Sequence, residues 1–101
     1  MMLLVCFDLP RDTKKERKQA NLYRKRLVEL GFAMKQFSLY EREIRQKTTR
    51  EKVIKILRSE IPDTGSITLY LLPDEVNDTQ ITILGEQVVK TTVRAPQLIF
   101  L

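Results

Sequence analysis

Apolar and polar positions along the chain form a pattern that predicts short strands separated by two helices. The chain opens with an apolar run from Met2 to Phe7, which is typical of a buried strand. Partial alternation from Phe32 to Ile44 predicts an extended segment, either one long strand or two strands broken near Gln36 to Ser38. Two further short strands are expected at Ile67 to Leu72 and at Ile81 to Leu84.

Each predicted helix begins with a capping-box pattern, a threonine followed three residues later by glutamate. Thr13 and Glu16 open the first helix, which Gly31 ends, and Thr48 and Glu51 open the second. Apolar residues recur at helical spacing in both: Ala20, Tyr23, Leu27 and Leu30 in the first, and Val53, Ile54 and Leu57 in the second. The second helix is expected to end before Pro62 and a turn at residues 63–65, and residues 74–78 are expected to form a polar turn.

This order of elements predicts an α+β, ferredoxin-like fold, a split β-α-β sandwich with both helices on one face of the sheet. The 101 residues suffice for a single domain spanning residues 1–101. No apolar run approaches the roughly 18 residues that cross a bilayer, so a soluble protein without membrane contact is expected. Cys6 is the only cysteine, which fits a reducing cytoplasm and predicts a packing role for its side chain.

The chain ends with a short apolar strand at residues 97–101, set apart from the preceding strand by a long connection. Exposed apolar edges are prone to pair with other chains. Leu98, Ile99 and Phe100 are therefore expected to complete the sheet of a partner in a two-fold dimer. The sequence leaves equally open that this strand folds back on its own sheet.

Composition narrows the chemistry to carboxylates and a hard cation, because the chain contains no histidine. Histidine-dependent nucleophile pairs, imidazole zinc sites and imidazole acid/base catalysis are excluded. Asp8 closes the first strand just before Leu9 and Pro10, where a carboxylate is held by the strand and open to a metal. Asp8 is the candidate catalytic and metal-binding residue, with Mg²⁺ as the expected cofactor. The alternative is that Asp8 only accepts hydrogen bonds from turn amides.

Positive charge is concentrated in the first half of the chain, although the whole chain has a net charge of +5. Residues 1–50 hold 13 lysines and arginines against 6 acidic residues, and the remainder holds 5 against 7. A basic helix can be merely solvated, but this asymmetry favours binding of nucleic-acid phosphates, without sequence preference. The cations expected to bind are Arg11, Lys14, Lys15, Arg17, Lys18, Arg24 and Lys25, with Arg26 beside them.

The segment from Gln36 to Tyr40 carries two aromatic side chains and a serine. Phe37 and Tyr40 are expected to be core aromatics of the sheet rather than residues that stack on nucleic-acid bases. Ser38 could form a hydrogen bond near the strand end beside Asp8, but it is more simply a sheet residue.

Together, these residues resemble the CRISPR-associated protein two family, the small subunit of the spacer-acquisition machinery. The resemblance rests on Phe7-Asp8-Leu9-Pro10, the basic helix ending at Gly31-Phe32, the segment from Gln36 to Tyr40 and the apolar tail. Many family members have tyrosine at the position of Phe7, so a role of that hydroxyl is in question here.

The resemblance implies a homodimer of ferredoxin-like protomers in which two Asp8 side chains share one magnesium ion. It further implies slow endonuclease activity on RNA or double-stranded DNA. A second implied role is structural: the dimer would bridge dimers of the large CRISPR integrase subunit and hold a short DNA duplex. A toxin-like ribonuclease acting on messenger RNA is the remaining alternative, since some such toxins resemble this fold.

Overall fold

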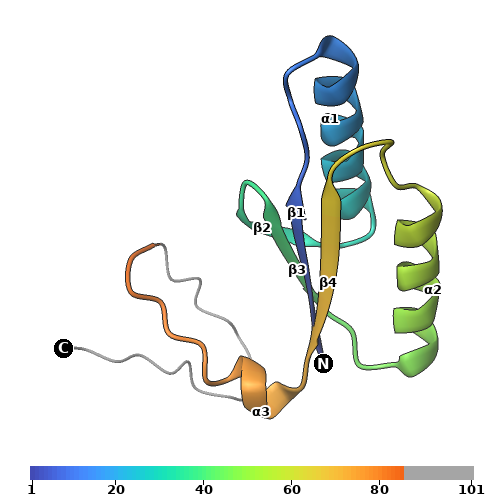
Figure 1. Ribbon diagram of the computed structural model, residues 1–101. Helices are drawn as coiled ribbons and strands as arrows, with labels where there is room; N and C mark the ends of the chain where they lie inside the picture. The colour runs from blue at the N-terminus through green and yellow to red at the C-terminus, as the bar shows by residue number, and fades with distance from the viewer. Residues whose placement is uncertain (86–101) are drawn as a thin grey trace.

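The computed structural model describes residues 1–85, which form a four-stranded antiparallel sheet with two long helices on one face (Figure 1). The elements are β1 (Met2–Asp8), α1 (Lys14–Glu29), β2 (Ala33–Gln36), β3 (Leu39–Glu43), α2 (Lys47–Ser59), β4 (Ser66–Leu72) and α3 (Asp74–Asn77). The strand order is β2-β3-β1-β4, so β1 lies between β3 and β4. This is the ferredoxin-like arrangement that the pattern of elements predicts.

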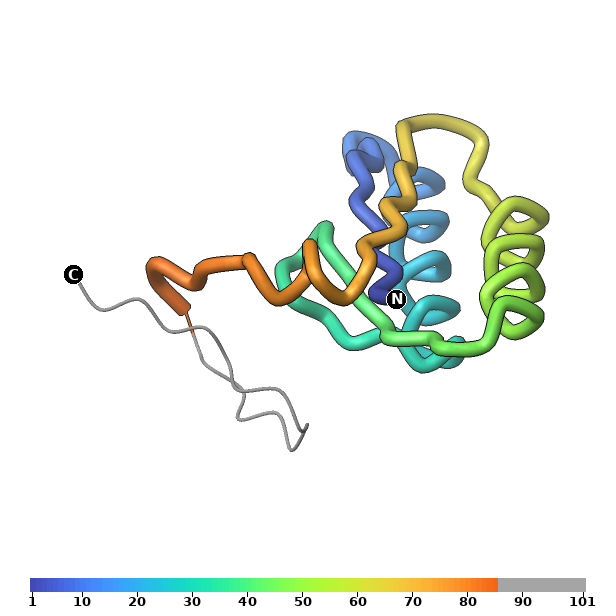
Figure 2. The backbone as a smooth tube through the Cα atoms, turned by 90° about the horizontal axis from the view of Figure 1, so that it is seen from below, coloured from blue at the N-terminus to red at the C-terminus, as the bar shows by residue number. Residues whose placement is uncertain are grey.

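Strand β1 supplies the centre of the core through alternate residues. Leu3, Val5 and Phe7 are buried beneath the helices, since successive strand side chains point to opposite faces. The helices contribute their apolar stripes, with Ala20, Tyr23 and Leu27 from α1 and Val53 and Leu57 from α2. Viewed from below, both helices lie on the same side of the sheet (Figure 2).

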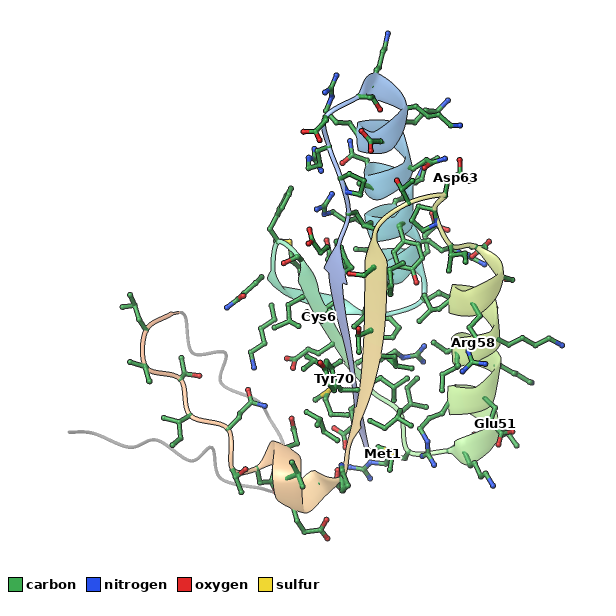
Figure 3. All side chains as sticks on the ribbon, viewed as in Figure 1. Met1, Cys6, Glu51, Arg58, Asp63 and Tyr70 are labelled. Carbon is green, nitrogen blue, oxygen red and sulfur yellow. The ribbon has the colours of Figure 1, made fainter. Side chains whose placement is uncertain are left out.

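The opposite face of the sheet carries the even-numbered residues of β1. Leu4 and Cys6 lie on this open face, with Leu39 of β3 and Tyr70 of β4 beside them in the strand register. Cys6 and Tyr70 are both exposed (Figure 3). The predicted packing role of Cys6 within the core is therefore wrong for this chain. Every residue of the first strand is apolar up to Asp8, so the sequence alone does not tell which parity faces the helices.

Helix α1 begins and ends where the sequence predicts. The Thr13 hydroxyl accepts a hydrogen bond from the Glu16 amide at 3.1 Å, and the Glu16 carboxylate accepts from the Thr13 amide at 2.9 Å. Gly31 follows the helix with φ +85°, a conformation that favours glycine. Both ends of α1 are thus fixed by local chemistry.

Helix α2 differs from the sequence prediction, because it begins at Lys47 with Gln46 as its N-cap residue. Thr48 is already inside the first turn and cannot cap the helix. The Arg50 amide donates to the Gln46 carbonyl oxygen at 3.1 Å, and the Arg50 side chain donates to the Arg45 carbonyl oxygen at 2.9 Å. These contacts start the helix without a side-chain cap on the helix amides.

Two predictions near the end of the described residues are wrong. The expected polar turn over residues 74–78 is the short helix α3 with its C-cap at Asp78. Residues 81–84 form no strand, since the chain leaves the sheet after β4 and no neighbouring strand within residues 1–85 pairs with this segment. Ile83 and Leu84 are accordingly 94% and 96% exposed. The expected C-terminal strand at residues 97–101 lies outside the described residues.

Candidate nucleic-acid interface

Asp8 is exposed at the end of the central strand, on the face of the sheet that the helices leave open. Its parity is that of Leu4 and Cys6, and its register partner on β4 is Ser66. The strand fixes the backbone of Asp8 while its carboxylate remains accessible to solvent. The structure therefore places the candidate catalytic carboxylate where the sequence predicts a strand end.

Two loops hold this strand end in place. The Phe7 amide donates to the Ser38 carbonyl oxygen at 3.0 Å, which attaches the turn between β2 and β3. Gly65, with φ +102°, leads into β4 so close to the Asp8 carbonyl oxygen that an added Cβ would lie 2.7 Å from that oxygen. It would also lie 2.9 Å from the Leu9 side chain. Ser38 thus acts near Asp8 through its backbone.

A metal ion has few ligands available from one copy of the chain. Within residues 1–85, no three carboxylate, thiol or imidazole side chains gather as a metal-binding group. Asp8 therefore belongs to no such group of three within the described part of one protomer. A small number of protein ligands is sufficient for Mg²⁺, because this ion binds one or two carboxylates and keeps several waters.

The predicted basic face of α1 is divided into parts that differ in their contacts. Lys14, Lys18 and Lys25 lie on the outward face, because spacings of 4 and 11 residues return to the same side of a helix. All three are exposed, and no ion pair is seen for them among residues 1–85. This triad is free to contact phosphates.

Other cations of α1 are engaged within the protein. Lys15 forms an ion pair with Asp63 at 3.3 Å, and Gln19 donates to Asp63 at 2.9 Å. The hydrogen bond from Gln19, followed by the contact with Lys15, lowers the pKa of Asp63. Arg17 donates to the Arg11 carbonyl oxygen at 3.0 Å, which steadies the loop before the helix.

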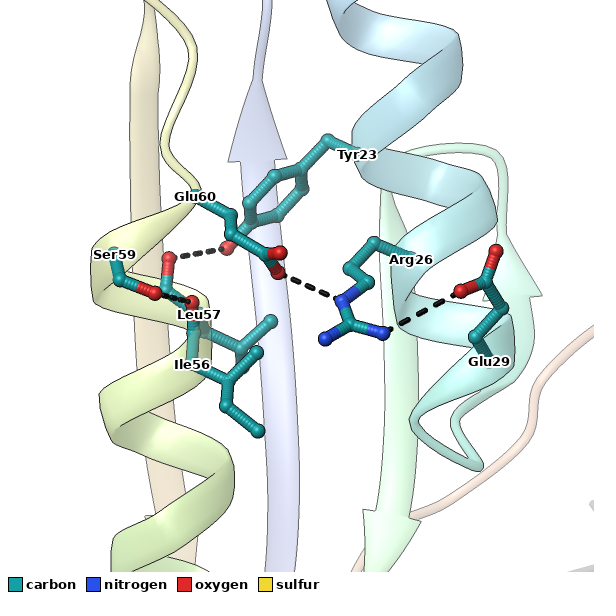
Figure 4. Close-up of polar contacts among 7 residues, drawn as sticks. All are labelled: Tyr23, Arg26, Glu29, Ile56, Leu57, Ser59 and Glu60. Carbon is teal, nitrogen blue, oxygen red and sulfur yellow. Dashed lines mark hydrogen bonds and ion pairs between the residues drawn. The ribbon is translucent and has the colours of Figure 1, made fainter.

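Arg26 joins the two helices at the C-terminal end of α2. Its Nε donates to Glu60 at 2.7 Å, and its NH1 group lies 3.4 Å from Glu29 (Figure 4). The hydrogen bond to Glu60 raises the pKa of Arg26. The nearby Tyr23 hydroxyl lies 3.4 Å from the Leu57 carbonyl oxygen, to which it donates (Figure 4). These contacts are structural and make Arg26 a poorer candidate for phosphate binding.

Arg24 of α1 and Arg11 of the loop before α1 both lie against the turn between β2 and β3. The Arg24 guanidinium carbon is 4.0 Å from the centre of the Phe37 ring and 5.2 Å from that of Phe7. Arg24 Nε donates to the Phe37 carbonyl oxygen at 3.1 Å. Burial, and then the positive charge of Arg11, lower the pKa of Arg24. We refer to Arg11, Arg24 and Phe37 as the Arg-Phe cluster.

The two aromatic residues of the turn segment have different environments. Tyr40 is buried and stacks on Phe7 with ring centres 5.8 Å apart, which confirms it as a core aromatic. Phe37 is 61% exposed, so the expectation that it belongs to the core is wrong. The turn at Phe37 and Ser38 lifts this side chain out of the sheet. Phe7 is itself buried against Tyr23 and Tyr40.

The sequence did not reveal two features of the site: the close approach of Gly65 to Asp8 and the contacts of Arg24 with Phe37. The turn containing Gly65 is visible in the sequence, but its contact with Asp8 spans more than fifty residues and no local pattern marks it. In the sequence, nothing distinguishes Arg24 from the other cations of the first helix. In the structure, its guanidinium contacts the rings of Phe7 and Phe37.

Comparison with known proteins gives a consistent result. The family model described as CRISPR associated protein Cas2 matches residues 1–80. A protein named CRISPR-associated endoribonuclease Cas2 from Flavobacterium psychrophilum is 36% identical over 97% of this chain and 85% of its own length. A protein of the same name from Ligilactobacillus salivarius is 32% identical over 100% of both chains.

A solved structure agrees with the fold. The crystal structure of Streptococcus pyogenes Cas2 at pH 6.5 superimposes with a TM-score of 0.65 and 26% sequence identity, covering 84% of this chain and 100% of that one. No helix within residues 1–85 is long and apolar enough to cross a membrane.

Proposed function

Because the chain belongs to the family of CRISPR associated protein Cas2, we propose that it is a dimeric nucleic-acid-binding protein of CRISPR adaptation with magnesium-dependent endonuclease activity. The observation that carries the proposal is the position of Asp8. Its carboxylate is exposed at a rigid strand end, and the Arg-Phe cluster begins three residues later at Arg11. A carboxylate with cations close by in the chain suits cleavage of a phosphodiester.

The open face of the sheet supports a homodimer. It presents Leu4, Leu39 and Tyr70 along with Asp8, so a second copy packed there would cover apolar surface. A two-fold axis near the end of β1 would bring two Asp8 side chains together, and like charges at short range favour a cation between them. Strand β4 is also an edge of the sheet formed by residues 1–85, where a strand from a partner could pair.

The paired carboxylates would hold one Mg²⁺, which supplies charge stabilisation to the phosphodiester under attack. The residues of the chain perform the remaining tasks. Lys14, Lys18 and Lys25 attract the phosphate backbone, and the Ser38 and Gly65 contacts keep Asp8 in position. Since residues 1–85 offer no evident general base beside Asp8, cleavage is expected to be slow.

The exposed lysines of α1 also suit a second role, in which the protein bridges copies of the large integrase subunit. Exposed lysines on α1 would hold the middle of a short DNA duplex while the partner performs integration. This role needs the lysine triad and does not need the carboxylate of Asp8. The two roles can therefore be separated by substitution.

The test is integration of a short duplex into a CRISPR repeat array by the cognate large subunit. Three reactions are compared: without this protein, with wild type and with Asp8→Ala. Integration by Asp8→Ala at the wild-type level would assign the protein to bridging and make cleavage a separate activity. Loss of integration by a variant that still assembles and binds DNA would make the carboxylate part of adaptation. If wild type adds nothing to integration, the adaptation role is wrong.

A further inference from the structure

We infer that the Arg-Phe cluster is a subsite for one unpaired nucleotide near the end of β1, with the base on the Phe37 ring and a phosphate at the Arg11 guanidinium. The inference rests on the proposed nucleic-acid binding and adds a substrate preference to it. Residues 14, 18 and 25 can hold any phosphate backbone, whereas an aromatic ring recognises a base.

Exposure and rigidity together distinguish Phe37 from an ordinary surface residue. Phe37 is 61% exposed in the turn between β2 and β3. Arg24 nevertheless holds it through a guanidinium 4.0 Å from the ring centre and a 3.1 Å hydrogen bond to its carbonyl oxygen. Arg24 in turn rests against the buried ring of Phe7. A ring fixed in this way can accept a base without first losing much conformational freedom.

Two positively charged side chains lie near Phe37 without an acidic partner among the described residues, which favours binding of an anion there. Arg11 and Arg24 both lie over the ring, at 5.5 and 4.0 Å from its centre, and neither forms an ion pair with a described residue. The buried NH1 group of Arg24 has no hydrogen-bond partner within residues 1–85. Arg11 reaches the Asn21 side chain at a long 3.4 Å. Two neighbouring guanidiniums repel each other, and a phosphate between them would relieve that repulsion.

The cluster lies against the end of β1. Phe7, whose ring contacts Arg24, immediately precedes Asp8, and its amide is hydrogen-bonded to the residue after Phe37. A nucleotide stacked on Phe37 would therefore lie near the end of β1 on the helix side of the sheet, whereas the Asp8 side chain lies on the open side. Bases inside a duplex have both faces covered, so only a single strand or a frayed end can use this subsite.

The test measures fluorescence anisotropy of the full chain with two labelled single strands of equal length, one normal and one with abasic residues. Both strands carry the same phosphates, so any difference reports contact with bases. We expect wild type to bind the normal strand about tenfold more tightly, the scale of one aromatic stacking contact. Phe37→Leu should lose that preference and Phe37→Tyr should retain it.

Two controls separate the ring from the charge. Arg11→Ala should weaken both strands by the same factor, and by more than Arg58→Ala, which removes an equal charge from exposed α2 (Figure 3). Thermal unfolding should show little change for Phe37→Leu, because the ring is mostly exposed.

Equal affinity of wild type for the normal and abasic strands would overturn the subsite and leave phosphate binding intact. A Phe37→Leu loss of the same size on both strands would also overturn it, since the ring would then act only through folding or charge placement. Failure of wild type to bind any strand or duplex would instead contradict the proposed function itself. The wild-type comparison needs no variant, so equal affinity for the two strands would overturn the subsite even if a substitution impairs folding, and Phe37→Tyr provides a second variant that keeps the ring.

Discussion

The turn at Gly65 lies against the backbone carbonyl of Asp8, leaving no room for a side chain between them. This contact joins the end of β1 to the start of β4 at the position of the candidate carboxylate. Because the obstacle is backbone rather than a flexible side chain, the strand end itself must move if the space is filled.

Replacing Gly65 with alanine should destabilise the protein by about 2 kcal/mol or more, from the positive φ and the clash with Asp8 combined. Gly31→Ala is a matched control, since Gly31 also has positive φ but an added Cβ would meet only the Arg42 side chain. Urea unfolding of both variants measures the difference. Equal losses would show that the contact with Asp8 costs nothing beyond backbone strain.

Asp8→Asn should abolish magnesium-dependent cleavage while leaving the fold and duplex affinity intact. Removing a negative charge beside a phosphate-binding surface can only raise that affinity slightly. Gel-based cleavage and anisotropy on the same preparation test both parts. Cleavage that persists at the wild-type rate would assign the activity to another residue or to a contaminant.

Substituting Lys14, Lys18 and Lys25 together with alanine should weaken duplex binding uniformly across sequences. The slope of log affinity against log salt should flatten by about 0.9 for each phosphate that the variant no longer neutralises. Lys52, Lys55 and Arg58 of α2 are exposed and supply a control with the same loss of charge. If the control variant reduces the slope as much as the α1 variant, the duplex does not prefer α1.

Stability should fall as pH rises above about 10, partly through Tyr23. Burial, and then the charge of Glu60, raise the pKa of Tyr23, so the unfolded chain loses this proton before the folded chain does. The free energy of unfolding must then decrease with pH in that range.

Urea unfolding at about pH 9 and pH 11 measures this effect, with Tyr23→Phe expected to lessen the decline. Tyr70→Phe is the control, because Tyr70 is half exposed. A decline that both variants share with wild type would mean that other groups cause it.

The sheet and α1 could be predicted because their signals are local. The capping box at Thr13 and the helical spacing up to Gly31 each act within a few residues, and the structure confirms both. The sequence left open whether residues 32–44 form one strand or two, and the structure has two, β2 and β3. The order of the elements along the chain was enough to give the ferredoxin-like topology.

The errors arise where a distant partner decides the outcome. Cys6 belongs to a strand that is apolar at every position up to Asp8, so the side covered by helices determines its exposure. The sequence predicts Phe37 to be a core aromatic of the sheet, but the residue lies in a turn and is mostly exposed. Its ring is contacted by the guanidinium of Arg24, which is thirteen residues earlier in the chain. The segment at residues 81–84 has strand composition but no strand to pair with among the described residues.

The candidate site could be anticipated only in part. Asp8 was identifiable because a carboxylate ending an apolar strand is a local feature, and its exposure agrees with that role. The cations were identifiable as a group, but not the division into exposed lysines, internally paired residues and the Arg-Phe cluster. That division depends on contacts with Glu60 and Asp63, which follow α2, and with Phe37 in the turn between β2 and β3.

The strand order also governs when the end of β1 is completed during synthesis. Strand β1 leaves the ribosome first, yet its partner β4 begins at residue 66 and the Gly65 contact comes just before it. Pairing over so long a sequence separation is a late event in folding. A nascent chain that ends before β4 therefore carries Asp8 on an incomplete sheet, and this strand end takes its final form only after nearly all of the described residues have been translated.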